Sequence, residues 1–250
     1  MMWNAVVLAG DRNPKDPVAR AGLTPHKSAA PVGDRRLIDF PLAALGAMMD
    51  EGRIGRIIVA LAPGAPEPAP GPWDCIEAGD DVISSVDRAY QTVGAPLLVT
   101  TCDAAMLTPE ILTEFLDRSE DGPELSAAII PAALAEPTPE APPRPTFALK
   151  EGRYVGANLF AIATATPAPA FEGLAKLNRR PTQMLASALS WKLRPPTIAT
   201  VEAKAAKRLG CSAQIVELSA SEAGFEVNTA LDLVHFRQRW AAWLSSEQAA

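Results

Sequence analysis

The chain has 250 residues, 48% of them hydrophobic, enough to bury the core of one large domain. A formal net charge of −6 argues against a nucleic-acid-binding protein, which usually presents a basic face. Three cysteines without a CxxC pair and only two histidines argue against a zinc site and a secreted disulfide framework. No signal peptide and no membrane span of roughly 18 apolar residues is recognisable. We therefore expect a cytoplasmic protein; its oligomeric state has no signal in the sequence.

The first half of the chain alternates between apolar strands and helices. Strands are expected at 3–9, 55–62, 95–103 and 125–132, and helices between them at 38–52, 79–94 and 107–119. The last of these helices has Thr108 as its N-cap and Pro109 at its first position. This alternation predicts right-handed βαβ crossovers and a parallel sheet. Two proline-rich stretches, 63–73 and 136–145, are expected to be loops.

The second half follows a different order. A strand is expected at 154–163, followed by two or three helices up to Gly210. Two further strands are expected at 213–219 and 225–228, and a long helix from Thr229. The whole pattern predicts a single α/β domain over residues 1–250.

Candidate ligand-binding positions follow the ends of three of the expected strands. Ligands bind open parallel sheets beyond the carboxyl ends of the strands, and Gly10, Asp103 and Asn228 take such positions. The loop after Gly10 fits neither GxGxxG nor a P-loop, but it offers backbone amides and several cations, which suits a polyphosphate: Arg12, Lys15, Arg20 and Lys27. Asp103 suits magnesium held together with phosphate oxygens, or simply caps the next turn.

Four segments in order resemble a known superfamily. They read "VVLAG…HKSAAPVGDRRLIDFPLAAL", "LLVTTCDAAMLTPEIL", "GANLFAI" and "FEVNTALDL". Together they resemble the glycosyltransferase-A-like nucleotidyltransferases, and within them the NTP-transferase-like proteins related to molybdenum-cofactor nucleotidyltransferases. The resemblance implies a Rossmann-like three-layer α/β/α sandwich with a mostly parallel, mixed sheet. Residues 1–131 would form the nucleotide-binding half, and 146–250 the acceptor-binding half with the C-terminal helix.

The resemblance also implies a reaction and roles for residues. A magnesium-dependent enzyme would transfer NMP from an NTP to a phosphorylated small-molecule acceptor and release pyrophosphate, with catalysis resting on positioning and charge neutralisation. Lys27 would neutralise phosphate charge, and Arg12 or Arg20 would stand in for the arginine of the family. The backbone near the nucleotide would come from Leu8, Ala9, Gly10 and Asp11. Asn158 would contact the acceptor part of the product, while Asp103 and Asn228 would hold Mg²⁺.

Several positions leave alternatives open. Asp11 replaces the second glycine of the family and Asn228 an aspartate of many relatives, so a catalytically degenerate nucleotide-binding or regulatory protein is the second hypothesis. Asn228 also suits an N-cap of the last helix. Ser85 with Val86 resembles the serine-valine helix start of cytidylyltransferases, which favours CTP slightly over GTP or UTP, although an ordinary helix start explains it too. A glycosyltransferase would need an Asp-x-Asp element, which "TCDAA" does not supply.

Overall fold

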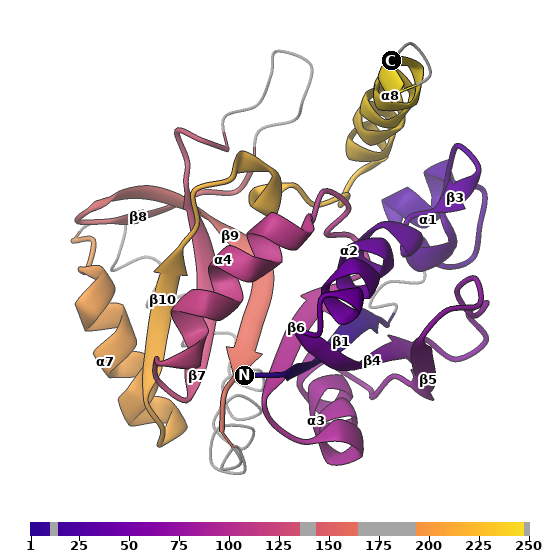
Figure 1. Cartoon of the computed structure of the whole chain (residues 1–250). Helices are drawn as coiled ribbons and strands as arrows, with labels where there is room; N and C mark the ends of the chain where they lie inside the picture. Colours follow the sequence, from indigo (N-terminus) through magenta and orange to yellow (C-terminus); the bar gives the residue numbers. More distant parts are fainter. Residues whose placement is uncertain (11–14, 136–143, 165–193, 248–250) are drawn as a thin grey trace.

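The computed structural model describes residues 1–10, 15–135, 144–164 and 194–247, and it is built around one eight-stranded sheet (Figure 1). The strand order is β10-β7-β9-β6-β1-β4-β5, with β8 paired to β9. The strands are β1 (Trp3–Ala9), β4 (Ile54–Leu61), β5 (Trp73–Glu77), β6 (Leu97–Thr101), β7 (Leu125–Pro131), β8 (Phe147–Leu149), β9 (Gly152–Ile162) and β10 (Ala213–Glu217). Only β9, with its neighbours β6, β7 and β8, pairs antiparallel among these strands, so the predicted mixed, mostly parallel sheet is confirmed.

Helices cover both faces of the sheet, which confirms the predicted three layers. On one face, α2 (Asp39–Asp50) and α4 (Pro109–Glu120) pack over the largest hydrophobic core (Figure 1). The opposite face carries α3 (Val82–Val93) and α7 (Ile198–Leu209). The central strands are buried on both sides because their apolar residues run without alternation, as parallel strands between two helical layers require.

Helix starts follow the local sequence. Thr108 caps α4, accepting the Ile111 amide at 3.4 Å, and Pro109 occupies the first turn, as predicted. Asp81 caps α3 in a capping box with Ser84, which resolves the choice between the two aspartates that precede this helix.

A small accessory layer lies beyond the carboxyl end of β1, a central strand of the sheet. It contains α1 (Pro17–Ala21), the 3₁₀ turn η1 (Lys27–Ala29), the short hairpin β2 (Pro31–Val32) and β3 (Arg35–Arg36), and the C-terminal helix α8 (Ala230–Glu247). A separate core joins them, including Val18, Leu37, Phe40, Leu233 and Phe236. The segment from α1 to β3 and the C-terminal helix α8 therefore pack together, as α1 and α8 do in Figure 1.

The structure differs from the predicted order of elements in four places. The opening loop contains α1, which forms because Asp16 accepts the amides of Val18 and Ala19. β5 begins at the end of a proline-rich run, and β8 is a three-residue strand; both are too short or too polar for a pattern to reveal. Residues 225–228 form no strand: Val227 donates its amide to the Asp103 carbonyl at 3.0 Å, and this bond holds the segment across the sheet edge instead of extending the sheet.

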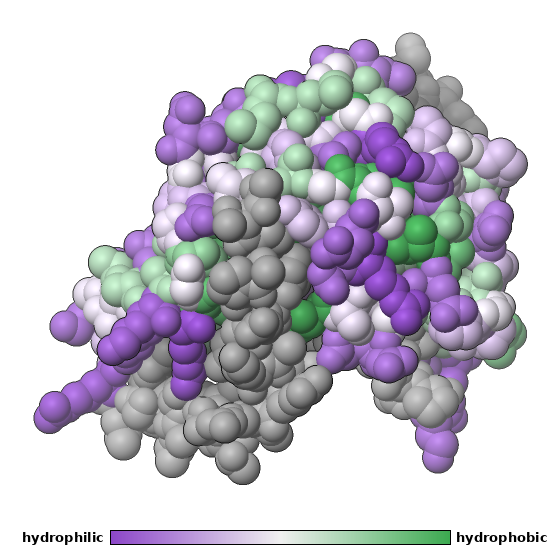
Figure 2. All heavy atoms as spheres, turned by 90° about the horizontal axis from the view of Figure 1, so that it is seen from below, coloured by the Kyte–Doolittle hydropathy of each residue, from purple (hydrophilic) through white to green (hydrophobic). Residues whose placement is uncertain are grey.

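The described surface is mixed in polarity. In the view from below, hydrophilic residues separate apolar patches from one another (Figure 2). Among the residues that the structure describes, none of the helices combines the length and the apolar character needed to cross a membrane.

Candidate active site

A cavity of about 370 Å³ opens where β1 and β6 end, and both halves of the chain line it. It brings together most of the predicted site residues: Leu8, Gly10, Lys27, Ser85, Asp103, Asn158 and Asn228. Its lining also includes residues that were not predicted, among them Asp16, Thr101 and Glu226. Ala9 and Arg20 are not among the described lining residues, and Asp11 and Arg12 lie outside the part of the chain that the structure describes.

Lys27 occupies the centre of the polar cluster. Its ammonium forms an ion pair with the Asp103 carboxylate and donates to Asn228 Oδ1 at 2.8 Å. The side chains of Lys27 and Asp103 are 14% and 12% exposed, so this is not a solvated surface lysine. A positive charge thus lies between two acceptor oxygens, one from Asp103 and one from Asn228.

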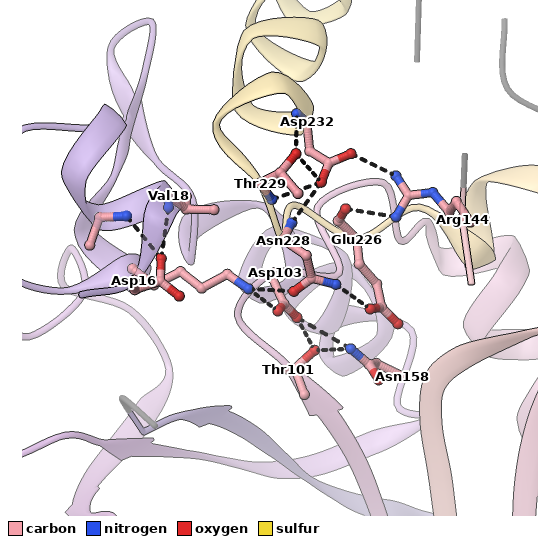
Figure 3. A network of polar contacts seen from close by, with 12 residues as sticks. Asp16, Val18, Thr101, Asp103, Arg144, Asn158, Glu226, Asn228, Thr229 and Asp232 are labelled. Atoms are coloured by element: carbon pink, nitrogen blue, oxygen red, sulfur yellow. Dashed lines mark hydrogen bonds and ion pairs between the residues drawn. The ribbon is translucent and has the colours of Figure 1, made fainter. Parts of the chain in front are cut away.

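Asp103 is held from its other side by β6 and β9. The Thr101 hydroxyl donates to Asp103 Oδ1, and Asn158 Nδ2 donates to Thr101 Oγ1 at 3.0 Å (Figure 3). Asn158 Nδ2 also lies 3.4 Å from Asp103 Oδ1. Because Asn158 comes from the strand that pairs with β6, the sheet itself fixes this carboxylate.

The segment that carries Asn228 is anchored by Asp232, in the first turn of α8. Asp232 Oδ2 accepts the backbone N–H of Asn228 at 3.1 Å and that of Thr229 at 2.8 Å. Thr229 Oγ1 in turn accepts the backbone N–H of Asp232 at 3.1 Å (Figure 3). Thr229 and Asp232 thus form the reciprocal cap of α8. The side chain of Asn228 is not the helix cap, which leaves it directed into the cavity.

Arg144 fastens this segment to the rest of the molecule. Its guanidinium pairs with Asp232 Oδ1 at 3.4 Å and donates to the Glu226 carbonyl at 2.8 Å (Figure 3). It also lies over the Phe225 ring, 4.6 Å from the centroid. The side chains of Arg144 and Asp232 are 13% and 4% exposed, so the pair is largely withdrawn from water.

Glu226 lines the cavity and was not predicted from the sequence. Its Oε2 accepts the Asn228 Nδ2 group at 2.7 Å (Figure 3). Burial, and next to it the negative charge of Asp103, raises the pKa of the Glu226 carboxyl. The available signal was its place two residues before Asn228, which puts both side chains on the same side of an extended segment.

Ser85 belongs to the opposite wall of the cavity. Its hydroxyl accepts the Gly79 amide at 2.9 Å and donates to the Asp81 carbonyl at 2.7 Å. Gly79 is required here because a Cβ would lie 2.3 Å from Ser84 Oγ. Both contacts support the turn before α3, in line with the simpler of the two predictions for this serine.

The charge of the lining is strongly acidic. Five carboxyl side chains line the cavity: Asp16, Asp80, Asp81, Asp103 and Glu226. Lys27 is the one cation among the described lining residues. A polyphosphate therefore needs additional positive charge to enter, and the pair of oxygen donors around the Lys27 ammonium suits a hard cation.

The oxygens of Asp103 and Asn228 suit a magnesium ion whose other ligands are water and phosphate better than a metal ion bound by protein side chains alone. Mg²⁺ is usually bound through one or two carboxylates with water and substrate phosphates completing its shell. The described residues contain no group of three or more His, Cys, Asp or Glu side chains that could hold a metal by themselves. Asp103 and Asn228 match the first arrangement.

Comparison with solved structures identifies the fold. A hypothetical transferase from Thermus thermophilus is 24% identical with a TM-score of 0.74, over 93% of this chain and 100% of that one. The 2-C-methyl-D-erythritol 4-phosphate cytidylyltransferase from Thermus thermophilus is 19% identical with a TM-score of 0.58, over 96% of this chain and 98% of that one. The fold is that of the glycosyltransferase-A-like nucleotidyltransferases.

A third structure extends this comparison. CMP:2-keto-3-deoxy-manno-octonic acid synthetase, solved with CTP, is 15% identical with a TM-score of 0.55, and the match covers 97% of this chain and 99% of that one. No family model and no curated protein sequence matches the chain. At these identities the likeness establishes the fold alone. The narrower resemblance to molybdenum-cofactor nucleotidyltransferases stays a prediction.

Proposed function

We propose that the chain is a magnesium-dependent nucleotidyltransferase that transfers CMP from CTP to a phosphorylated small-molecule acceptor. The observation that carries the proposal is the cluster of Lys27, Asp103 and Asn228 at the strand ends of a nucleotidyltransferase fold. The acidic lining supports it, because a triphosphate can enter such a cavity only together with a cation. Two of the structural neighbours support CTP: one is named a cytidylyltransferase and one was solved with CTP.

The reaction exchanges one phosphorus–oxygen bond for another. An acceptor phosphate oxygen attacks the α-phosphorus of CTP, and the bond from the α-phosphorus to the bridging oxygen breaks, so that pyrophosphate leaves with that electron pair. Because both partners are negatively charged, catalysis depends on positioning and charge neutralisation. No proton has to be removed from an ionised acceptor phosphate, so the site needs no general base.

The described side chains divide this work. Lys27 neutralises charge on the phosphates, and the backbone at Gly10 approaches the nucleotide. Asp103 and Asn228 would hold Mg²⁺, which supplies further positive charge to the phosphates when bound. Asn158 remains proposed for the acceptor side. Arg20 is exposed on α1 and is not among the described lining residues, and Arg12 lies outside the described part of the chain, so either remains proposed for the arginine role.

The test combines turnover with folding. We expect Asp103→Asn and Lys27→Ala each to lower pyrophosphate release from CTP at least about 100-fold, the scale seen when a group that stabilises transition-state charge is removed. Circular dichroism should show that both variants keep the fold. Asp121→Asn and Lys150→Ala, at exposed positions, are the matched controls and should retain activity. Full turnover in both site variants would disprove the assignment.

A catalytically degenerate protein that binds a nucleotide is the second candidate. The engagement of Lys27 by both Asp103 and Asn228 favours it, because this lysine must exchange partners before it can meet a phosphate. Thermal shift with CTP and Mg²⁺, followed by a pyrophosphate assay with phosphorylated acceptors, separates the two. Stabilisation without pyrophosphate release across the acceptors supports the second candidate.

A further inference from the structure

The amide group of Asn228 is held from both ends. Its Oδ1 accepts from the Lys27 ammonium at 2.8 Å, and its Nδ2 donates to Glu226 Oε2 at 2.7 Å. An ammonium can only donate hydrogen bonds, and an ionised carboxylate can only accept them. The two neighbours therefore permit one orientation of the amide, with oxygen toward Lys27 and nitrogen toward Glu226.

The remaining contacts of this segment fix the main chain and not the amide. Asp232 accepts the backbone amide of Asn228, and the Asp103 carbonyl accepts that of Val227. Neither contact distinguishes the two ends of the side-chain amide, which can rotate by half a turn about its last bond. Without the Glu226 carboxylate, the NH₂ group could face the position of the Lys27 ammonium, where it would repel any cation.

We propose that Glu226 is a positioning residue that keeps the amide oxygen of Asn228 facing the cation position. The inference rests on the proposed function, since it assigns Asn228 to a divalent cation. Partners that orient metal ligands typically change metal affinity 10- to 100-fold when they are removed. Glu226 thus acts on the cation through Asn228, in contrast to a carboxylate that acts by ligating the metal or by its charge alone.

A double-mutant cycle separates these roles, with Mn²⁺ as the probe and free Mn²⁺ measured by electron paramagnetic resonance in the presence of CTP. Glu226→Gln should weaken Mn²⁺ binding about tenfold when residue 228 is asparagine. The same change should have an effect of no more than about twofold in an Asn228→Asp background, because a carboxylate has two equivalent oxygens and no orientation to fix. Glu51→Gln, at an exposed helix end, is the control and should leave Mn²⁺ binding unchanged.

Each result has a definite meaning. Coupling between positions 226 and 228 of the expected size supports the proposal. A tenfold loss in both backgrounds overturns it, because Glu226 would then act by charge or direct ligation. Unchanged Mn²⁺ binding by Glu226→Gln with asparagine at position 228 overturns it as well. In both cases the proposed function stands. If the wild-type chain binds no Mn²⁺ with CTP, the proposed function fails and the inference fails with it.

Discussion

The two walls of the candidate site are built in different ways. The wall formed by Gly10, Ser85 and Asp103 comes from the ends of β1 and β6 and the start of α3, and we call it the strand wall. The wall formed by residues 225–229 is irregular chain between η2 (Ser221–Gly224) and α8, and we call it the loop wall. The strand wall is held by sheet hydrogen bonds, and the loop wall chiefly by the side chains of Arg144 and Asp232.

The difference predicts where the site is vulnerable. Backbone bonds of a central sheet survive most single substitutions, because the change leaves the ladder intact. A wall held by one buried ion pair loses its geometry when one partner is removed, since the other charge is left without compensation. Replacing a residue that supports the loop wall should therefore have a larger effect than a substitution of equal size in the strand wall.

The largest effect is expected for Arg144→Met. The change removes the partner of Asp232, whose side chain is 4% exposed, and should lower the free energy of unfolding by about 3 kcal/mol. Because Asp232 holds the amides of Asn228 and Thr229, Mn²⁺ binding in the presence of CTP should weaken too. Urea unfolding followed by circular dichroism measures the stability, and electron paramagnetic resonance the binding.

Arg56→Met is the matched control for this variant. Arg56 pairs with Asp74 at 2.8 Å, but the two side chains are 51% and 64% exposed, so its loss should cost less than about 1 kcal/mol. If both arginine variants lose the same stability, burial of the Arg144 pair does not secure the loop wall.

An intermediate effect is expected in the strand wall for Ser85→Ala. The buried hydroxyl satisfies the Gly79 amide and the Asp81 carbonyl, and its loss should cost about 1–2 kcal/mol. If support of this turn is its whole role, CTP affinity should stay unchanged once the variant is folded. A marked loss of CTP affinity without a loss of stability would instead place Ser85 at the nucleobase. Ser84→Ala, at the neighbouring hydroxyl that forms the capping box with Asp81, serves as the control.

The strand wall was largely predictable from sequence. The apolar runs gave β1, β4 and β6, and the rule that ligands bind beyond strand ends directed attention to Gly10 and Asp103. Helix-forming segments with their start and stop residues located α2, α3 and α4 to within a few residues. These features depend on neighbouring residues, so local patterns contain them.

The loop wall was not predictable in the same way. Residues 225–228 have the alternation of a strand, but toward the sheet their main chain bonds only the Asp103 carbonyl, and they pair with no neighbouring strand among the described residues. The pair between Arg144 and Asp232 spans 88 positions, and no local pattern reports such a contact. Glu226 was missed for the same reason, because its importance comes from what surrounds it in the fold.

The smallest effect is expected for Glu226→Gln in metal-free protein, where the substitution should raise the stability instead of lowering it. Burial and Asp103 raise the pKa of Glu226 in the folded state above its unfolded value. At low pH the carboxyl is protonated and carries no charge in the folded chain. The stability that this preserves is lost as the pH rises through the folded pKa. Glutamine cannot ionise, and either end of its amide can pair with the Asn228 amide, so the variant should melt about 2 °C above wild type at neutral pH.

The pH dependence of that gain is the decisive measurement. In EDTA, the difference in melting temperature should shrink as the pH is lowered into the range where Glu226 takes up its proton, because the two side chains then carry the same charge. Glu51→Gln, exposed at the end of α2, should show no such trend. A variant less stable than wild type at every pH would show that the Glu226 carboxylate supports the loop wall. The expected result means that at neutral pH the folded chain retains an unfavourable negative charge at Glu226 beside Asp103, which protonation or a bound cation would relieve.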